Sequence, residues 1–311
     1  MPTQSVASFA LEQYRFIRAS GPDAKSFLQG QVTCDTSKIT PTQSVPGALC
    51  NLKGRAIADF RALEIDGDVL LQVSSGLQDK VLAILKKYAV FSKLTLSNED
   101  NFQALGLHIP NDSDSDLHHS LFANALPKAP GAASPLETGC TMLRTELRRQ
   151  PVIAIEVWGS AEKLNTLKAT LGSKLSHGDI VSWTEAENLS GIAHITEDMS
   201  EEFTPALLNY DISGVVDFKK GCYTGQEIVA RMFYRSTPKK RLFALQAQAP
   251  LTAPLSIVAE GLEDEDLGEA FSVTPHSALA VLPIEAAQNK LAGLNGEELT
   301  LLELLYSEPE A

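Results

Sequence analysis

Residues 217–231 read DFKKGCYTGQEIVAR, and this stretch says more about the fold than any other part of the chain. Gly221 and Gly225 permit tight backbone turns, and good helix formers follow them. We therefore expect a helix that begins near Tyr223, with Cys222 beside its first turn. Unpaired N–H groups at a helix start, together with two preceding lysines, favour the thiolate form of a cysteine and can hold an anion. The alternative is that Cys222 is a small buried core residue.

Charge is unevenly distributed along the chain. Lys and Arg number 26 and Asp and Glu 39, so the formal net charge is −13. Residues 242–311 carry twelve acids and one base, whereas residues 219–241 carry seven bases and one acid. The overall negative charge repels polyphosphate, so we expect no direct grip on nucleic acid. The basic segment 219–241 is either a solvated face or a local anion site.

Several common kinds of active site have no signature in this sequence. The chain lacks the glycine-rich phosphate loops, the H-E-x-x-H zinc motif and the G-x-S-x-G nucleophile elbow. Its six histidines and four cysteines do not pair at metal-ligand spacing, and one cysteine cannot hold an iron–sulphur cluster. Hydrolase and metalloenzyme interpretations therefore have no support, and we expect no tightly bound metal.

Cysteine usage and hydropathy indicate a compartment. The four cysteines form no C-x-x-C pair and are too few for a disulfide scaffold. The first residues lack a basic start followed by an apolar run, and no stretch reaches the apolar length of a membrane span. We expect a cytoplasmic protein with reduced thiols and no membrane contact.

The pattern of apolar residues predicts an α+β chain that ends in a small all-β domain. Strands are expected at residues 47–51, 56–65, 69–73, 93–96, 102–109, 152–158 and 242–246, and helices at 24–32, 77–88 and 160–171. Ser182-Trp183-Thr184-Glu185 has the form of a capping box and predicts the start of a further helix, which Gly191 could end. Residues 110–139 are polar and rich in turn formers, and predict a surface excursion. We place the domain boundary between residues 240 and 241.

Several motifs of the chain are similar to those of one known family. Residues 220–227, KGCYTGQE, resemble the signature of the YgfZ family, the folate-binding proteins related to the glycine-cleavage T-protein and to a mitochondrial iron–sulphur assembly factor. Further matches stand in family order at residues 27–33 (FLQGQVT), at Cys50 with Lys53-Gly54, at residues 87–93 (KYAVFSK), at Phe203-x-Pro205 and at Asn209. The resemblance spans residues 14–245, which is most of the chain.

This resemblance implies a fold, a ligand and a cellular role. Family members have intertwined α+β subdomains around a central hole and a C-terminal antiparallel β-barrel, and tetrahydrofolate or a derivative binds in the hole. Bacterial members are similar to factors that maintain iron–sulphur enzymes, including one that thiomethylates tRNA. By resemblance, the chain is a folate-binding accessory protein for the assembly or repair of iron–sulphur enzymes, with an indirect link to tRNA.

The resemblance also implies site residues. Cys222 takes the position of the family cysteine and is the expected catalytic residue. Tyr14 and Trp183 match two aromatic positions that contact folate in the family, with a Tyr at the first position where a bacterial relative has a Trp. From the residues alone, Trp183 is better explained as a core anchor. The remaining expected cofactor contacts, with basic groups facing the glutamate tail, are Asn209, Lys220, Gln226 and Arg231.

Two positions depart from the T-protein pattern. Leu189 stands where T-proteins place a Glu that pairs with the pterin, and the nearby Glu185 and Glu187 do not have the same spacing. Ala58-Asp59 stands where T-proteins carry an Asp-Asp pair, one of which serves methylene transfer. Two alternatives therefore stay open. One is a folate-dependent aminomethyltransferase, which Asp59 favours, and the other is a ligand-free scaffold protein, which the missing Glu favours.

Overall fold

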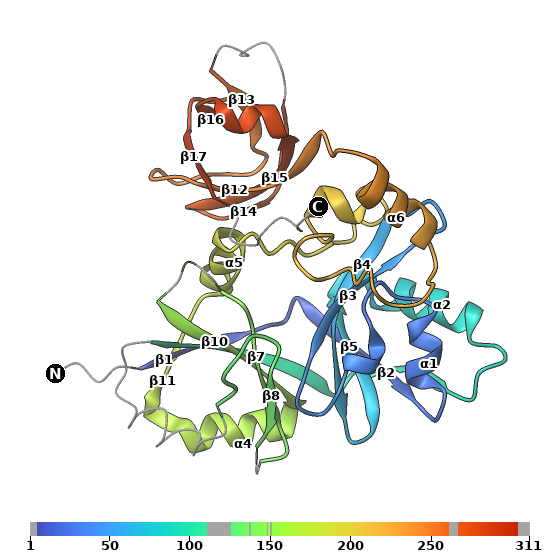
Figure 1. Ribbon diagram of the computed structural model, residues 1–311. Coiled ribbons are helices and arrows are strands. Elements are labelled where there is room, and N and C mark those ends of the chain that lie inside the picture. Colours follow the sequence, from blue (N-terminus) through green and yellow to red (C-terminus); the bar gives the residue numbers. More distant parts are fainter. Residues whose placement is uncertain are drawn as a thin grey trace.

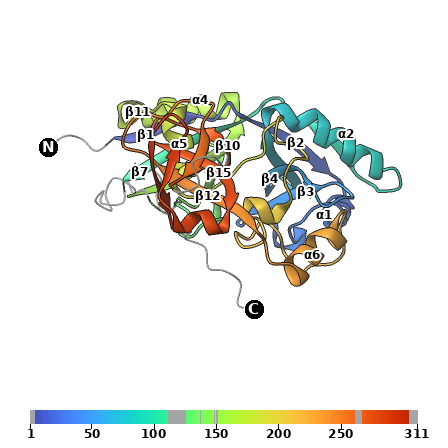
Figure 2. The ribbon, with the colours of Figure 1, turned by 90° about the horizontal axis from the view of Figure 1, so that it is seen from above.

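The computed structural model describes residues 5–303, apart from residues 111–125, 137, 148, 150 and 261–266. The chain forms two β-sheets side by side and a closed β-barrel, which lies above the six-stranded sheet (Figure 1). Helix α5 (Ile180–Leu189) lies between this sheet and the barrel. Seen from above, the barrel covers the six-stranded sheet and leaves the five-stranded sheet beside it (Figure 2).

The five-stranded sheet is antiparallel and has the order β3-β4-β5-β2-β6. Its strands are β2 (Tyr14–Ser20), β3 (Val45–Cys50), β4 (Ala56–Ile65), β5 (Asp68–Ser74) and β6 (Thr95–Asn98). Strands β4 and β5 meet at Asp66-Gly67, which have φ values of 55° and 84°. Two successive positive φ values give a turn whose twist suits a hairpin, so the predicted hairpin is confirmed.

Helices surround this sheet and bury the largest core of the described chain against it. They are α1 (Ala24–Gln29), α2 (Gln78–Tyr88) and α6 (Gln226–Arg235). Apolar side chains from the sheet and from α1 and α2 pack with residues of the later segment 189–229. Short 3₁₀ helices lie along the chain at Thr36–Lys38, Ser75–Leu77, Gly172–Lys174, Pro205–Leu208 and Ile284–Gln288.

The six-stranded sheet has the order β11-β1-β7-β10-β9-β8. Its strands are β1 (Val6–Ala10), β7 (Phe102–Pro110), β8 (Ala133–Pro135), β9 (Thr141–Arg144), β10 (Val152–Ser160) and β11 (Leu175–His177). Helix α4 (Ala161–Leu171) packs on it through leucines at helical spacing. The Ser160 side chain caps this helix and Gly172, with φ 52°, ends it, so the helix expected at 160–171 is confirmed with Ser160 as its cap.

The chain passes back and forth between the two sheets. It starts in the six-stranded sheet with β1, forms the five-stranded sheet with β2–β6, and returns with β7–β11. Residues after α5 then go back to the five-stranded sheet, because the side chains of Ile195 to Val229 join its core. The prediction of intertwined α+β subdomains is confirmed.

A closed antiparallel barrel ends the described chain. Its strands are β12 (Lys240–Gln246), β13 (Ser256–Ala259), β14 (Gly268–Val273), β15 (Ser277–Pro283), β16 (Leu291–Gly293) and β17 (Glu298–Leu302), in the order β12-β15-β14-β13-β16-β17. Closure leaves no open strand edge and lets short strands enclose a separate apolar core. The predicted C-terminal β-barrel is confirmed.

The predicted starts of two helices are wrong. Helix α5 begins at Ile180, because Asp179 is the N-cap and its side chain accepts from the N–H of Val181. Ser182 therefore lies inside the helix and caps nothing. Helix α6 begins at Gln226 and not near Tyr223, because Gly225 has a φ of 82° and ends the preceding turn.

Part of the predicted surface excursion at residues 110–139 lies outside the described residues, namely 111–125 and 137. Within the described part, residues 133–135 form β8, which pairs with β9 at the edge of the six-stranded sheet. This part of the excursion therefore extends a sheet.

A buried ion pair joins the segment before α6 to the barrel. Both guanidinium ends of Arg241, the second residue of β12, donate to the Asp211 carboxylate at 2.9 and 3.0 Å. The two side chains are 13% and 2% exposed. Asn209 lies beside this pair, accepts from Arg241 at 3.1 Å and donates to the carbonyl of Leu242 at 2.8 Å. The pair holds the barrel at its position because both partners are largely shielded from water.

Replacing Arg241 by Ala should lower the free energy of unfolding by about 3–5 kcal/mol, since it leaves the Asp211 charge buried. Urea denaturation of the whole chain measures this change. The matched control is Lys290→Ala, which removes an exposed pair with Glu298 and should leave the urea midpoint unchanged. Equal effects of the two substitutions would contradict a structural role for the buried pair.

Candidate functional site

A cavity lies where the two sheets, helix α5 and the segment 190–194 meet. The space among its walls is about 1000 Å³, part of it open to solvent. Its walls come from β2, β3, β4, β5, β10 and α5, and from residues 145–147, 190–194 and 208–215. This central cavity corresponds to the predicted central hole.

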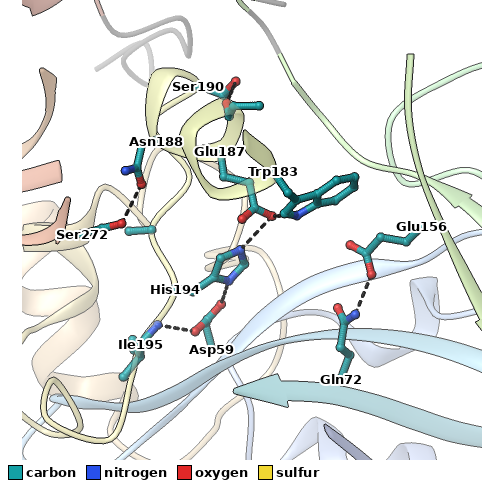
Figure 3. Close-up of polar contacts among 12 residues, drawn as sticks. Asp59, Gln72, Glu156, Trp183, Glu187, Asn188, Ser190, His194, Ile195 and Ser272 are labelled. Carbon is teal, nitrogen blue, oxygen red and sulfur yellow. Dashed lines mark hydrogen bonds and ion pairs between the residues drawn. The ribbon is translucent and has the colours of Figure 1, made fainter. Parts of the chain in front are cut away.

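A chain of three charged side chains runs along the wall of the central cavity (Figure 3). Asp59 on β4 accepts from the Nδ1 of His194 at 2.7 Å and from the backbone N–H of Ile195 at 2.7 Å. The Nε2 of His194 faces Oε1 of Glu187, on α5, at 3.6 Å. The chain therefore links a strand of the five-stranded sheet to helix α5.

His194 carries the positive charge in this chain. Burial of the imidazole opposes its protonation, but the charge of Asp59 and the hydrogen bonds to Asp59 and Glu187 outweigh burial and raise the pKa of His194 well above its usual range. The ring is therefore an imidazolium at neutral pH, with a hydrogen on each nitrogen.

A further carboxyl group reaches the cavity from the six-stranded sheet. Glu156, in the middle of β10, is 4% exposed, and its Oε2 accepts from Gln72 at 2.5 Å and from the indole of Trp158 at 2.8 Å. Burial raises the pKa of Glu156 above its usual value, and the charge of Arg61 partly opposes this shift. Glu156 therefore adds a buried carboxyl group from the six-stranded sheet to the cavity wall.

Tyr14 lies where the sequence predicts a ligand contact. It lines the cavity from the first residue of β2, and its ring meets the His194 ring edge-on at 5.5 Å between centroids. Burial, followed by the charge of Glu187, raises the pKa of Tyr14 well above its usual range. The phenol therefore stays neutral and presents an aromatic surface to the cavity.

Trp183 lies behind the cavity wall. Its side chain is 0% exposed and stacks on His108, with 4.9 Å between ring centroids and 20° between planes. The indole N–H donates to Glu187 at 2.8 Å. Neighbouring rings cover the indole, so Trp183 supports Glu187 and does not itself line the cavity, and its expected contact with a ligand stays a prediction.

Asn209 and Lys220, two other expected ligand contacts, form hydrogen bonds within the protein that fix neighbouring segments. Asn209 is fully buried at the junction with the barrel. The ammonium group of Lys220 donates to the carbonyls of Gln29 and Val32 at 2.6 and 2.5 Å, and lies over the Tyr223 ring at 5.0 Å. These bonds pin the segment that carries Cys222 against the end of α1.

The rest of the basic segment also lies apart from the cavity. The side chain of Gln226 accepts from the backbone N–H of Tyr223 at 3.3 Å, and Arg231 is exposed on α6. Cys222 is exposed, whereas Cys34, Cys50 and Cys140 are buried. Among the described residues that line the central cavity, none belongs to the segment 216–241. The structure therefore separates the Cys222 thiol from the central cavity.

Helix α5 brings a carboxylate to the cavity from residue 187, two residues before Leu189. Leu189 points into the apolar core, and the Glu187 side chain, 11% exposed, lines the cavity. Positions two apart on a helix lie on nearly opposite faces, so only one of the two can face the cavity.

Sequence reasoning missed three of the polar residues at this site, Glu187, His194 and Glu156. A signal was present for Glu156, which interrupts the apolar strand sequence VIAIEVWGS. A carboxyl group within a buried strand is costly unless it is bonded, so it marks a candidate functional position. His194 follows no motif, and only its contacts single it out.

Two findings concern other kinds of site. Within the described ranges, no three His, Cys, Asp or Glu side chains gather in a way that could hold a metal ion. In the same part of the chain, no helix has both the length and the apolar character needed to cross a bilayer.

Replacing His194 by Gln should destabilise the protein in a pH-dependent manner. A group whose pKa is raised by folding contributes stability that is complete below its unfolded value of about 6.5 and is lost as the pH rises through the folded value. The difference in melting temperature between wild type and variant should therefore be largest in mild acid and shrink in alkali. His177→Gln, at an exposed position, is the control. A difference that widens with rising pH would refute the charged imidazole.

Comparison with known proteins identifies relatives of this chain. It is 30% identical over 259 residues to the tRNA-modifying protein YgfZ of Klebsiella pneumoniae, covering 83% of this chain and 75% of that protein. It is 32% identical over 248 residues to the tRNA-modifying protein YgfZ of Photorhabdus laumondii, covering 79% and 73%. No protein-family model matches the chain.

One solved structure has the same fold. The glycine cleavage system aminomethyltransferase T from Bartonella henselae aligns with 98% of this chain and 88% of its own, at a TM-score of 0.74 and 15% identity. This likeness concerns the fold alone. The sequence relatives, at 30% and 32% identity over 75% and 73% of their own length, show that the chain belongs to the YgfZ family.

Proposed function

We propose that this chain is a folate-binding accessory protein that supports the assembly or repair of iron–sulphur enzymes, one of which acts in tRNA modification. The observation that carries the proposal is the central cavity, which combines an aromatic face with buried carboxyl groups. The T-protein-like fold, a folate-binding fold, favours tetrahydrofolate or a derivative as the ligand. The relatives named tRNA-modifying protein support the link to tRNA.

The polar atoms of the cavity suit the pteridine ring of a folate. A pteridine carries N–H donors on its pyrimidine edge, which a carboxylate oxygen accepts. The Oε1 of Glu187 already accepts from Trp183 and faces His194, so Glu187 offers its Oε2 to such a donor, and the Tyr14 ring offers a surface for the flat heterocycle. The hydroxyl of Thr145 is buried in the same wall and has no hydrogen-bond partner among the described residues. A buried unpaired hydroxyl is costly, which favours a ligand atom at this position.

Arg61 is the cation best placed for the glutamate tail. It lines the central cavity from β4, whereas the basic segment 219–241 does not reach it. We therefore assign the tail to Arg61, and we assign to Lys220 and Gln226 the task of shaping the loop around Cys222. When bound, tetrahydrofolate supplies one-carbon chemistry on its reduced ring nitrogens.

Cys222 is proposed as the reactive thiol toward client enzymes. Its exposure leaves the sulfur accessible to a partner protein, and the Lys220 bonds hold its loop in one conformation. A fixed, exposed thiol outside the folate cavity suits a contact with another macromolecule better than a reaction on the bound pteridine.

The alternative of an aminomethyltransferase is less well supported. Both oxygens of Asp59 are engaged, one by His194 and the other by the N–H of Ile195. An Asp that holds a substrate amine needs a free lone pair directed at the amine. In this structure each oxygen of Asp59 already accepts a hydrogen bond from the protein.

Folate binding tests the first part of the proposal. Wild-type protein titrated with tetrahydrofolate by calorimetry should bind, and Glu187→Gln should bind about tenfold or more weakly because a charged hydrogen-bond acceptor is lost. Glu185→Gln is the matched control, since Glu185 lies on the same helix and bonds to Thr274 of the barrel. Thr145→Val tests the cavity without touching the charged chain. No binding by wild type at millimolar ligand would remove folate from the proposal.

Complementation tests the second part. In a strain that lacks the gene, Cys222→Ala should fail to restore thiomethylated tRNA, measured by mass spectrometry, while the free energy of unfolding changes by less than about 0.5 kcal/mol. Lys219→Ala, an exposed neighbour, should complement. Full complementation by Cys222→Ala would remove the thiol from the function.

A further inference from the structure

A second chamber lies on the barrel side of the central cavity. It is bounded by α5, residues 74–76, residues 192–198 and the barrel strands β14 and β15. The space among its walls is about 1050 Å³, part of it open to solvent. Five residues line both spaces and form the boundary, here called the partition, between them: Tyr14, Ser74, Glu187, Ile192 and His194.

A buried amide group in this chamber lacks a partner. Asn188 is 2% exposed, and its Oδ1 accepts from Ser272 of the barrel at 2.8 Å (Figure 3). Its Nδ2 is buried and has no hydrogen-bond partner in the described part of the chain. If the side-chain amide of Asn188 were flipped, its oxygen would lack a partner instead of its nitrogen, because Ser272 bonds to only one of the two atoms. The buried Oε1 of Gln13, in the same lining, likewise has no partner there.

Unpaired buried polar atoms point to a ligand that supplies the missing bonds. Leaving such a group unsatisfied costs about 1–3 kcal/mol. The Nδ2 of Asn188 is a donor and would bond to an acceptor such as a carbonyl oxygen, whereas the Oε1 of Gln13 is an acceptor and would bond to a donor. A ligand with both kinds of group would satisfy both side chains.

The charged residues around the chamber are mainly negative, which favours a positively charged ligand. Glu197 and Asp198 are exposed and line it, and Glu187 adds a third carboxylate at the partition. Their charges outnumber that of His194, which the buried Asp59 also balances. The C-terminal end of α5 adds a partial negative charge, and the ring of Phe271 adds a face that attracts cations.

We propose that this chamber binds a small primary amine that also carries a carbonyl group. The ammonium group lies among Gln13, the rim carboxylates and Phe271, and the carbonyl oxygen accepts from Asn188. The same carboxylates repel anions, so the glutamate tail of a folate does not leave the central cavity through this chamber. This inference does not depend on folate binding, because Asn188, Gln13 and the rim residues Glu197 and Asp198 are not among the residues assigned to the folate.

Glycinamide is the probe, because it joins an ammonium group to an amide carbonyl. Binding to the full chain without folate is followed by saturation-transfer NMR at millimolar ligand, with acetamide and N-acetylglycinate as neutral and anionic controls. Glycinamide should bind with a clear preference over both. The double variant Glu197→Gln/Asp198→Asn, at exposed positions that do not threaten folding, should weaken it about fivefold. Lower salt should strengthen wild-type binding more than binding by the double variant.

Asn188→Leu separates the amide from the charges. This substitution should weaken glycinamide binding and leave the salt dependence of that binding unchanged. The melting curve of the variant shows whether the barrel still packs against the rest of the chain. The proposal is overturned if glycinamide does not bind, if acetamide binds equally well, or if the rim variant binds like wild type. If tetrahydrofolate binds and glycinamide does not, only this inference is refuted. If glycinamide binds and tetrahydrofolate does not, only the proposed folate binding is refuted.

Discussion

The bonded chain Asp59–His194–Glu187 is the interaction on which the centre of the molecule depends. It connects a strand of the five-stranded sheet, the segment after α5, and α5 itself. Burying carboxylates is costly unless a counter-charge and hydrogen bonds compensate them, and the imidazolium with the N–H of Ile195 provides both. Geometry at the cavity wall is therefore set by electrostatics as well as by apolar packing.

This constraint explains why the aromatic residues take different roles. Trp183 is buried against His108 and directs its N–H to Glu187, so its bulk and its polar atom both serve the position of one carboxylate. Tyr14 meets His194 edge-on from the opposite sheet and keeps its ring toward the cavity. The two aromatic positions look equivalent in sequence, but Trp183 supports the Glu187 carboxylate whereas Tyr14 presents its ring to the cavity.

The fold also keeps two features apart. The loop of Cys222 is bonded to the end of α1 through Lys220, while the central cavity lies between the sheets and α5. An exposed thiol can meet a macromolecule that never enters a cavity of small-molecule size. The barrel adds a third region, because its strands close the chamber that contains the unpaired amide of Asn188. The charged partition between the two spaces lets one protein present separate chemical environments on either side of it.

Local sequence determined much of this architecture. The turn at Asp66-Gly67, the capped helix after Ser160 and the alternating strands follow from periodicity and turn chemistry, which act between near neighbours. The motif KGCYTGQE and its companions were sufficient to indicate the family and hence the intertwined subdomains and the barrel. Tertiary structure alone decided which groups meet. Asp59 and His194 are 135 residues apart, and no local rule pairs them. The same holds for Glu187, whose side chain faces the cavity only because helix α5 starts at Ile180 and is rotated by its packing between sheet and barrel.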